Sequence, residues 1–248
     1  MTIKPQTTTN EILVELDSIL ESGVMLDRNS PAVLGLFASI DKLENADPDE
    51  AINLRALVLH ICNDLDGALN ALEQREHKDL LRNLVLLSNY SRCLLAQEIF
   101  ANWCNPTSGN FWRSVAFAYP IGAFRKLAEF AREATRMKLQ GKNVISLEEV
   151  FMIDEVLDEL GITDTAAGRV MELAGEVLAE HGFMFIGPSP EVEVVDEGGG
   201  NRAVHLTYRI SSNATDAVSM YMKFIEQLFY REIAMPDGFH VSFGGALS

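Results

Sequence analysis

The stretch VVDEGGGNRAVHLTYRI, residues 194–210, marks a change in the period of the hydrophobic pattern. From residue 204 onward apolar residues alternate with polar ones, as in a strand with one buried face. Three consecutive glycines, 198–200, separate this run from the strand-like residues 191–195. A phosphate-binding loop would need a helix after the glycines, whereas a strand follows here. We therefore predict a β-hairpin with the glycines at its tip, where positive φ angles cost glycine little.

The elements around this hairpin predict an acidic α+β domain over residues 143–248. Two amphipathic helices precede the hairpin, and the first of them begins behind a capping box formed by Ser146 and Glu149. A long helix over residues 214–233 follows, and another strand-like run covers residues 239–243. This order predicts an antiparallel hairpin followed by a C-terminal β-α-β unit.

The N-terminal part of the chain shows helical periods throughout. Polar residues 1–9 are predicted to form a flexible tail, and a capping box at Thr8 and Glu11 predicts the first helix start. Ser30 and Asp47 each stand directly before a proline, which is typical of a capped helix N-terminus. We predict an all-α region of helical hairpins over residues 10–142. The fold class is thus α+β and predominantly helical, with the helical-hairpin array first and the small α+β domain second.

The segment NDLDGALNALE, residues 63–73, has two interpretations. Its acidic residues and glycine fit several positions of an EF-hand calcium loop, but Cys62 would occupy the first position, where the ion needs an oxygen ligand. The same segment resembles the turn of a tetratricopeptide repeat, although no second copy follows at the period of about 34 residues. The resemblance implies stacked helical hairpins, and the cysteine argues against calcium.

Charge and cysteine usage restrict the classes of partner. The net charge of −16 argues against a nucleic-acid binder, which needs Lys and Arg to neutralise phosphates. Residues 121–142 are basic and the helix after Ser146 is acidic, so these two segments either pair or each face water. The chain has three cysteines, no apolar run of membrane-spanning length and no N-terminal signal pattern. We expect reduced thiols, no membrane and a cytoplasmic location.

Polar residues on two predicted strands form the candidate ligand site. If the strands share a sheet, one face carries His205, Thr207, Arg209, His240 and Ser242. The alternative is a solvated face without a site, which antiparallel sheets commonly have. The sequence contains no HExxH, no Cys/His cluster and no GxSxG. We accordingly predict no metal site, no cofactor and no catalytic residues.

The long C-terminal helix carries more apolar residues than one small sheet can cover. One stripe, which includes Ala217 and Phe224, is expected to pack on the sheet. The second stripe is the candidate interaction surface and consists of Val218, Met222, Ile225 and Phe229. It packs on the helical region, on a second copy of the chain or on a protein partner.

These features favour a non-enzymatic protein-protein interaction or regulatory protein, active as a homodimer or with a protein partner. The alternative is a small-ligand-binding protein or an enzyme, with its site between the helical region and the C-terminal sheet. A third hypothesis is an acidic inhibitor of a basic or nucleic-acid-binding target, whose binding would weaken with salt.

Overall fold

The chain divides into two compact units in its computed structural model. The structure describes residues 5–73, 85–86, 88, 90–104, 106–108, 111, 115–139, 146–183, 190–210 and 214–245. By internal contacts, the first unit comprises residues 1–85 and 182–187, and the second comprises residues 86–181 and 188–248. The boundary predicted at residues 142 and 143 falls inside the second unit, where helices from both sides of it pack together.

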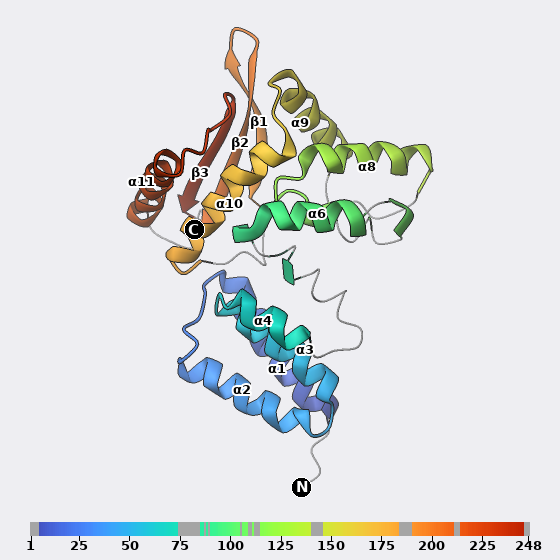
Figure 1. Cartoon of the computed structure of the whole chain (residues 1–248), viewed down its shortest axis with the longest axis vertical. Helices are drawn as coiled ribbons and strands as arrows, with labels where there is room; N and C mark the ends of the chain where they lie inside the picture. Colours follow the sequence, from blue (N-terminus) through green and yellow to red (C-terminus); the bar gives the residue numbers. More distant parts are fainter. Residues whose placement is uncertain are drawn as a thin grey trace. The chain divides into compact units, whose positions relative to one another are not determined.

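The first unit is built from helices that pack around an aliphatic core (Figure 1). Its helices are α1 (Pro5–Ser22), α2 (Pro31–Glu44), α3 (Pro48–Ile61) and α4 (Leu65–Leu72). The two predicted caps are confirmed: the Val33 amide donates to Ser30 Oγ at 3.3 Å, and the Glu50 amide donates to Asp47 Oδ1 at 3.1 Å. The Met25 amide donates to the Gly182 carbonyl at 2.7 Å, which joins residue 182 to this unit.

The start of the first helix differs from the predicted tail over residues 1–9 and from the predicted capping box at Thr8 and Glu11. Helix α1 begins at Pro5, so residues 5–9 are helical and Thr8 lies inside the helix. Proline is compatible with this start because the first helical turn leaves its backbone N–H groups unbonded in any case. Residues 1–4 of the predicted tail lie outside the described residues.

Helices α3 and α4 form a hairpin, and the segment between them is a helix cap. The Asp64 side chain accepts a hydrogen bond from the Gly67 amide at 2.9 Å and pairs with Arg28 Nη1 at 2.6 Å. Both interactions use the carboxylate that a calcium loop would direct at the ion. The segment therefore starts α4, as expected for a helical hairpin.

Acid is expected to destabilise the first unit through His60 on α3. Its side chain is buried, and this burial lowers the pKa of His60 from 6.5 to about 4. Between these values the unfolded chain binds a proton that the folded chain does not, so stability is full above pH 6.5 and falls on acidification. From pH 7 to about pH 4.5 the loss is roughly 2–3 kcal/mol.

Denaturant unfolding of the wild type and His60→Leu at both pH values measures the part of the acid-induced loss of stability that is due to His60. Carboxylate protonation affects both proteins alike, so we expect the variant to lose less stability than the wild type by that amount. An equal acid loss in the wild type and in His60→Leu would contradict the assignment.

The second unit combines helices with a three-stranded mixed sheet. Its longer helices are α6 (Cys93–Trp103), α8 (Phe124–Arg136), α9 (Leu147–Glu159), α10 (Asp164–Glu180) and α11 (Ala214–Tyr230). Short 3-10 turns η1 (Tyr90–Arg92), η2 (Pro106–Ser108) and η3 (Val115–Phe117) accompany them. The strands are β1 (Glu191–Gly198), β2 (Asn201–Ile210) and β3 (Phe239–Gly245). The predicted fold class, predominantly helical α+β, is confirmed.

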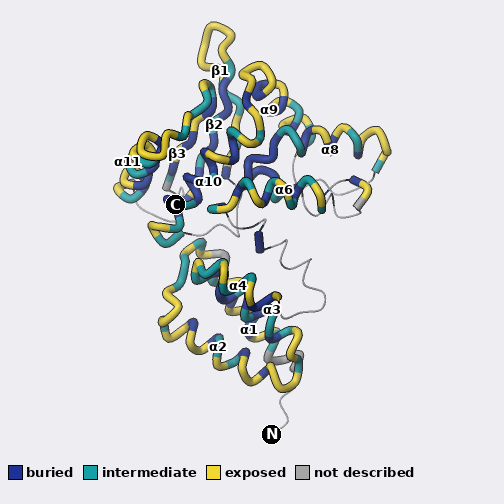
Figure 2. The backbone as a smooth tube through the Cα atoms, in the orientation of Figure 1, coloured by how far each residue is buried: buried dark blue, intermediate teal, exposed yellow. Residues whose placement is uncertain are grey.

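The sheet has the order β1-β2-β3, with β1 antiparallel and β3 parallel to the central strand. Helix α11 connects β2 to β3, which gives the predicted β-α-β unit. One face of the sheet is apolar and packs on helices: the rings of Phe224 on α11 and Phe243 on β3 lie 5.9 Å apart. Figure 2 shows β2 and α10 largely buried, while the hairpin tip and the outer side of α11 are exposed.

The predicted role of the glycines is confirmed. Gly198, Gly199 and Gly200 have φ angles of 94°, 67° and 85°, and they connect β1 to β2. A side chain at these positions would be strained by its backbone conformation. The loop is the tip of a hairpin between β1 and β2, and no helix follows the glycines as a phosphate-binding loop would require.

Candidate functional site

The five predicted site residues lie on the polar face of the sheet. In the parallel register, His205 on β2 is the partner of His240 on β3, and Thr207 is the partner of Ser242. Cross-strand partners project from the same face, so the alternation predicted from the sequence brings these side chains together. The apolar alternates of β2, among them Tyr208, are buried on the opposite face.

Thr207, Arg209 and Ser242 on this face bind neighbouring strand residues. Thr207 Oγ1 and Ser242 Oγ are 2.9 Å apart and share a hydrogen bond. Arg209 forms an ion pair with Glu191 of β1, with Nη2 and Oε2 at 2.7 Å. This pairing satisfies the guanidinium, so Arg209 stands apart from the histidines as a strand-to-strand link.

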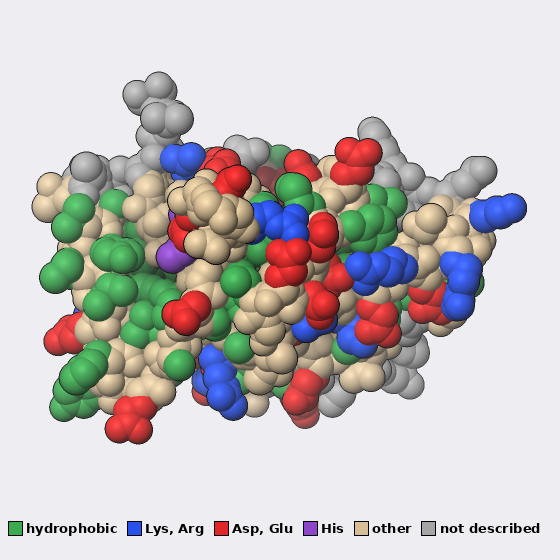
Figure 3. All heavy atoms as spheres, turned by 90° about the horizontal axis from the view of Figure 1, so that it is seen from above, with side chains coloured by type: hydrophobic (Ala, Val, Ile, Leu, Met, Phe, Trp, Pro, Cys, Tyr) green, Lys and Arg blue, Asp and Glu red, His purple; other side chains and the backbone are tan. Residues whose placement is uncertain are grey.

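The two histidines share a carboxylate that the sequence pattern did not identify. Glu197 Oε1 lies 3.1 Å from His240 Nε2 and 3.6 Å from His205 Nε2. The imidazole rings are in contact, with centroids 4.6 Å apart. We call Glu197, His205 and His240 the His-Glu cluster. Figure 3 shows histidine side chains next to acidic ones on this exposed face.

Helix α11 exposes the whole of its second apolar stripe. The exposed fractions are 62% for Val218, 64% for Met222, 41% for Ile225 and 87% for Phe229. The first stripe is largely buried, because Phe224 and Leu228 pack inward. We call the four exposed residues the α11 seam. Hydrophobic side chains gather on the side of the molecule where α11 lies (Figures 1 and 3).

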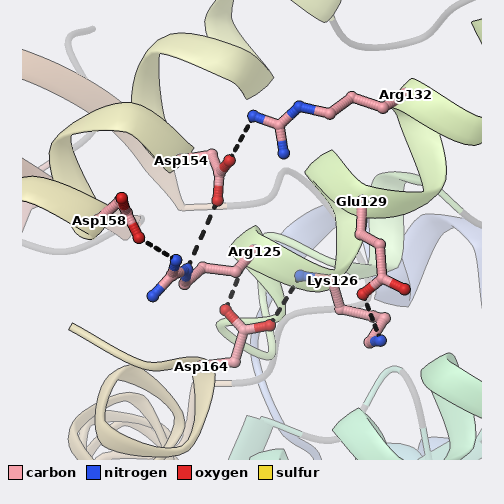
Figure 4. A network of polar contacts seen from close by, with 7 residues as sticks. All are labelled: Arg125, Lys126, Glu129, Arg132, Asp154, Asp158 and Asp164. Carbon is pink, nitrogen blue, oxygen red and sulfur yellow. Dashed lines mark hydrogen bonds and ion pairs between the residues drawn. The ribbon is translucent and has the colours of Figure 1, made fainter. Parts of the chain in front are cut away.

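The basic and acidic segments face each other, as the first of the two alternatives predicted. Asp154 on α9 is buried and accepts a hydrogen bond from Arg132 Nη2 on α8 at 2.6 Å. Arg125, also on α8, lies 3.6 Å from the Asp154 carboxylate and pairs with Asp158 (Figure 4). Three charged contacts thus hold α8 against α9. Exposed ion pairs contribute little singly, so the buried Asp154 is the central member.

Asp164 caps α8 although it belongs to α10. Its two carboxylate oxygens accept hydrogen bonds from the backbone amides of Arg125 at 2.8 Å and Lys126 at 2.9 Å (Figure 4). The N-cap residue of α8 itself is Ala123, which has no side-chain acceptor. Burial raises the pKa of Asp164, against the two backbone hydrogen bonds, which lower it. Both oxygens are occupied, so we interpret this carboxylate as a structural cap.

A pocket of about 380 Å³ lies beside this cap, and its lining includes Leu94, Gln97, Ala123, Lys126, Asp164 and Thr165. Gln97 closes one side, and its Nε2 donates to the carbonyls of Ile121, Gly122 and Asp164 at 2.9, 3.2 and 2.7 Å. The Gln97 amide and the Asp164 carboxylate, which both line the pocket, are thus bonded to the surrounding backbone. The sequence gives no signal for this pocket, because its residues come from three separate helices.

The three cysteines are free thiols, and burial raises the pKa of the half-buried Cys62 thiol. Cys93 and Cys104 are buried, and burial raises the pKa of the Cys93 thiol, which keeps the reactive thiolate form unfavourable. Within the described parts of the chain, no helix is long and apolar enough to cross a membrane.

Comparison with known proteins gives no further guide to function. The sequence matches no protein-family model, and neither a curated protein nor a solved structure matches the chain.

Proposed function

We propose that this protein is a non-catalytic interaction protein that self-associates through the α11 seam. The observation that carries the proposal is the exposure of four large apolar side chains in one continuous row on α11. Contiguous exposed apolar patches of this kind mark interaction sites on soluble proteins. The other stripe of α11 already fills the core of the second unit, so packing there does not account for the seam.

The spacing of the seam fits a helical partner. Successive members are four, three and four residues apart, which is the a/d spacing of a helix-helix interface. A sheet or an extended peptide would impose no such spacing. The occupant of the seam is therefore a helix with an apolar row of its own.

A second copy of α11 is that helix. In an antiparallel pair centred between Lys223 and Phe224, Val218 faces Phe229 of the other copy and Met222 faces Ile225. The smallest member of the seam is thereby matched with the largest, which is the complementarity that a well-packed interface needs. Such an interface is isologous, because the same surface is used on both subunits.

Charge favours the same arrangement. The chain carries a net charge of −16, so two copies repel each other over most of their surface. The seam itself carries no charged side chain, and the nearby Lys223 and Glu226 are paired within the helix at 3.8 Å. Two chains thus approach with least repulsion at the seam, and high salt should strengthen the dimer.

Met222→Glu is expected to convert a dimer into a monomer. It places a carboxylate at the centre of the proposed interface, next to its symmetry equivalent, where burial of the charge is strongly unfavourable. Gln227→Glu is the matched control: it adds the same charge on another side of α11, beside Arg231, which already binds Gln227 Oε1 at 3.1 Å.

Size-exclusion chromatography with light scattering at about 100 µM measures the mass of each protein. We expect a dimeric mass for the wild type and Gln227→Glu, and a monomeric mass for Met222→Glu with an unchanged circular dichroism spectrum. A monomeric wild type, or a Met222→Glu variant that stays dimeric, overturns the proposal. The acidic-inhibitor hypothesis makes the opposite prediction for salt, since its complexes weaken as ionic strength rises.

A further inference from the structure

The His-Glu cluster has the composition and spacing of a metal site. The ligand atoms of Glu197, His205 and His240 all lie within 4.8 Å of one another. A Zn²⁺ ion bonds imidazole nitrogen and carboxylate oxygen at about 2.0–2.2 Å, so neighbouring ligands of a tetrahedral ion are about 3.3 Å apart. The two nitrogen-oxygen distances in the cluster, 3.1 and 3.6 Å, lie on either side of that value.

The fold fixes two of the three ligands on rigid elements. His205 and His240 are register partners on adjacent parallel strands, so their side chains leave the sheet side by side. The third ligand comes from an irregularity in β1. The register shifts between Asp196 and Gly198, which leaves Glu197 as the extra residue of a β-bulge. Bulges commonly redirect a side chain, and here the Glu197 carboxylate reaches both imidazoles.

A second observation points to a ligand at this place. The His205 Nε2 atom is itself inaccessible to solvent, and among the described residues it has no hydrogen-bond partner. Its contact with Glu197, at 3.6 Å, is longer than a hydrogen bond. A buried polar nitrogen without a hydrogen bond is destabilising, and coordination of a cation would use its lone pair.

The surroundings also suit a cation. Glu193 is the cross-strand partner of His205, and it contributes further negative charge to the same region of the sheet. The side chains of the cluster are partly exposed, so water can complete the coordination shell. Two imidazoles and one carboxylate are ligands for zinc and related divalent metals, whereas calcium and magnesium prefer all-oxygen sites.

We propose that Glu197, His205 and His240 form a binding site for a divalent transition metal of the Zn²⁺ class, with solvent as the remaining ligand. The site lies on the polar face predicted for ligand binding, and it includes both histidines of that prediction but not Thr207, Arg209 or Ser242. The proposal is independent of self-association, because the α11 seam contributes none of the three ligands.

Isothermal titration of the full chain with Zn²⁺ tests the site. We expect one ion per chain for the wild type and an affinity lower by about tenfold or more for each of His205→Ala, His240→Ala and Glu197→Gln. Glu193→Gln is the matched control, since it removes a carboxylate that adds negative charge near the cluster but is not one of the three ligands, and we expect its affinity to fall by only about twofold.

Thermal unfolding separates loss of the site from loss of the fold. Without metal, the three ligand variants should melt close to the wild type, because their side chains are on the exposed face of the sheet. With Zn²⁺ in excess, the wild type and Glu193→Gln should be stabilised and the ligand variants should not. No binding of Zn²⁺ by the wild type, or binding that survives in the variants with unchanged affinity, overturns the proposal.

Discussion

Gly175→Ala is expected to lower the free energy of unfolding of the second unit by about 3 kcal/mol or more, although alanine is the better helix former. Gly175 lies in the buried middle of α10, where the backbone of η1 crosses the helix. A Cβ atom at this position would collide with the carbonyl group of Tyr90 and lie 2.9 Å from the Ser91 amide nitrogen. These are backbone atoms, so no rotation of a side chain relieves the contact.

The consequence reaches the whole second unit. Helix α10 contacts η1, α6, α8, α11 and β3, so a shift that accommodates the new methyl group disturbs several interfaces at once. Protein interiors are packed like organic crystals, and extra methyl groups in such places force backbone displacement. The close approach of two backbones is thus the reason for glycine at this position.

Gly35→Ala is the matched control, because Gly35 is also a helical glycine but has no atom within 4 Å of the position that a methyl group would take. It lies on the exposed side of α2, and we expect this substitution to stabilise the first unit by about 1 kcal/mol. Denaturant unfolding, followed by circular dichroism, measures both variants. A Gly175→Ala protein as stable as the wild type would show that η1 does not cross α10 this closely.

The contrast between Gly175 and Gly35 shows which structural features can be predicted from sequence patterns alone. Both stand in helical segments, and the sequence alone does not distinguish them. Local signals are sufficient when donor and acceptor are neighbours in the chain: Ser146 accepts from the Glu149 amide at 3.4 Å, as its capping box predicts. The cap of α8 could not be found in this way, because Asp164 is 39 residues from the amide of Arg125.

For the candidate site, too, the sequence predicted the local features and missed those that depend on long-range contacts. Alternation along β2 and β3 places polar residues on one face, and this much follows from residue types. Which residues become neighbours depends on the strand register, a tertiary property that pairs His205 with His240. Glu197 was missed because it joins them through a bulge, and a bulge breaks the alternation on which the prediction depended.

The α11 seam was predicted as a surface, but its occupant was not. Two apolar stripes on one helix indicate two partners, and the structure identifies the first partner as the core of the second unit. The spacing and size order of the seam become informative only when its members are known to be exposed. The residue pattern thus predicts the surface, and the exposure of its four side chains in the structure makes self-association testable.

Gln97→Glu is expected to destabilise the second unit by about 3 kcal/mol or more at pH 7. The Nε2 group of Gln97 faces three backbone carbonyls, those of Ile121, Gly122 and Asp164. Only a donor is compatible with such surroundings, which fixes the orientation of the amide. A carboxylate offers acceptors alone, so the substitution exchanges attractive contacts for repulsion between oxygens. The introduced carboxylate cannot move away from the carbonyls on the side of Gly168, which packs so closely that even a methyl group there would collide with Gln97.

The loss should depend on pH in a direction that identifies its cause. The carbonyl oxygens disfavour the charged form, so the pKa of the introduced carboxyl is raised in the folded state. Stability is then recovered as pH falls through the folded-state pKa of that carboxyl, because the protonated carboxyl donates one hydrogen bond.

Gln97→Met is the matched control. It loses the hydrogen bonds without adding charge, costs about 1–2 kcal/mol and has the pH dependence of the wild type. Denaturant unfolding of the three proteins at pH 7 and about pH 5 measures both effects. Equal stability of the two variants at pH 7 would mean that the Gln97 side chain does not face these carbonyls, and that the link between α6, α8 and α10 lies elsewhere.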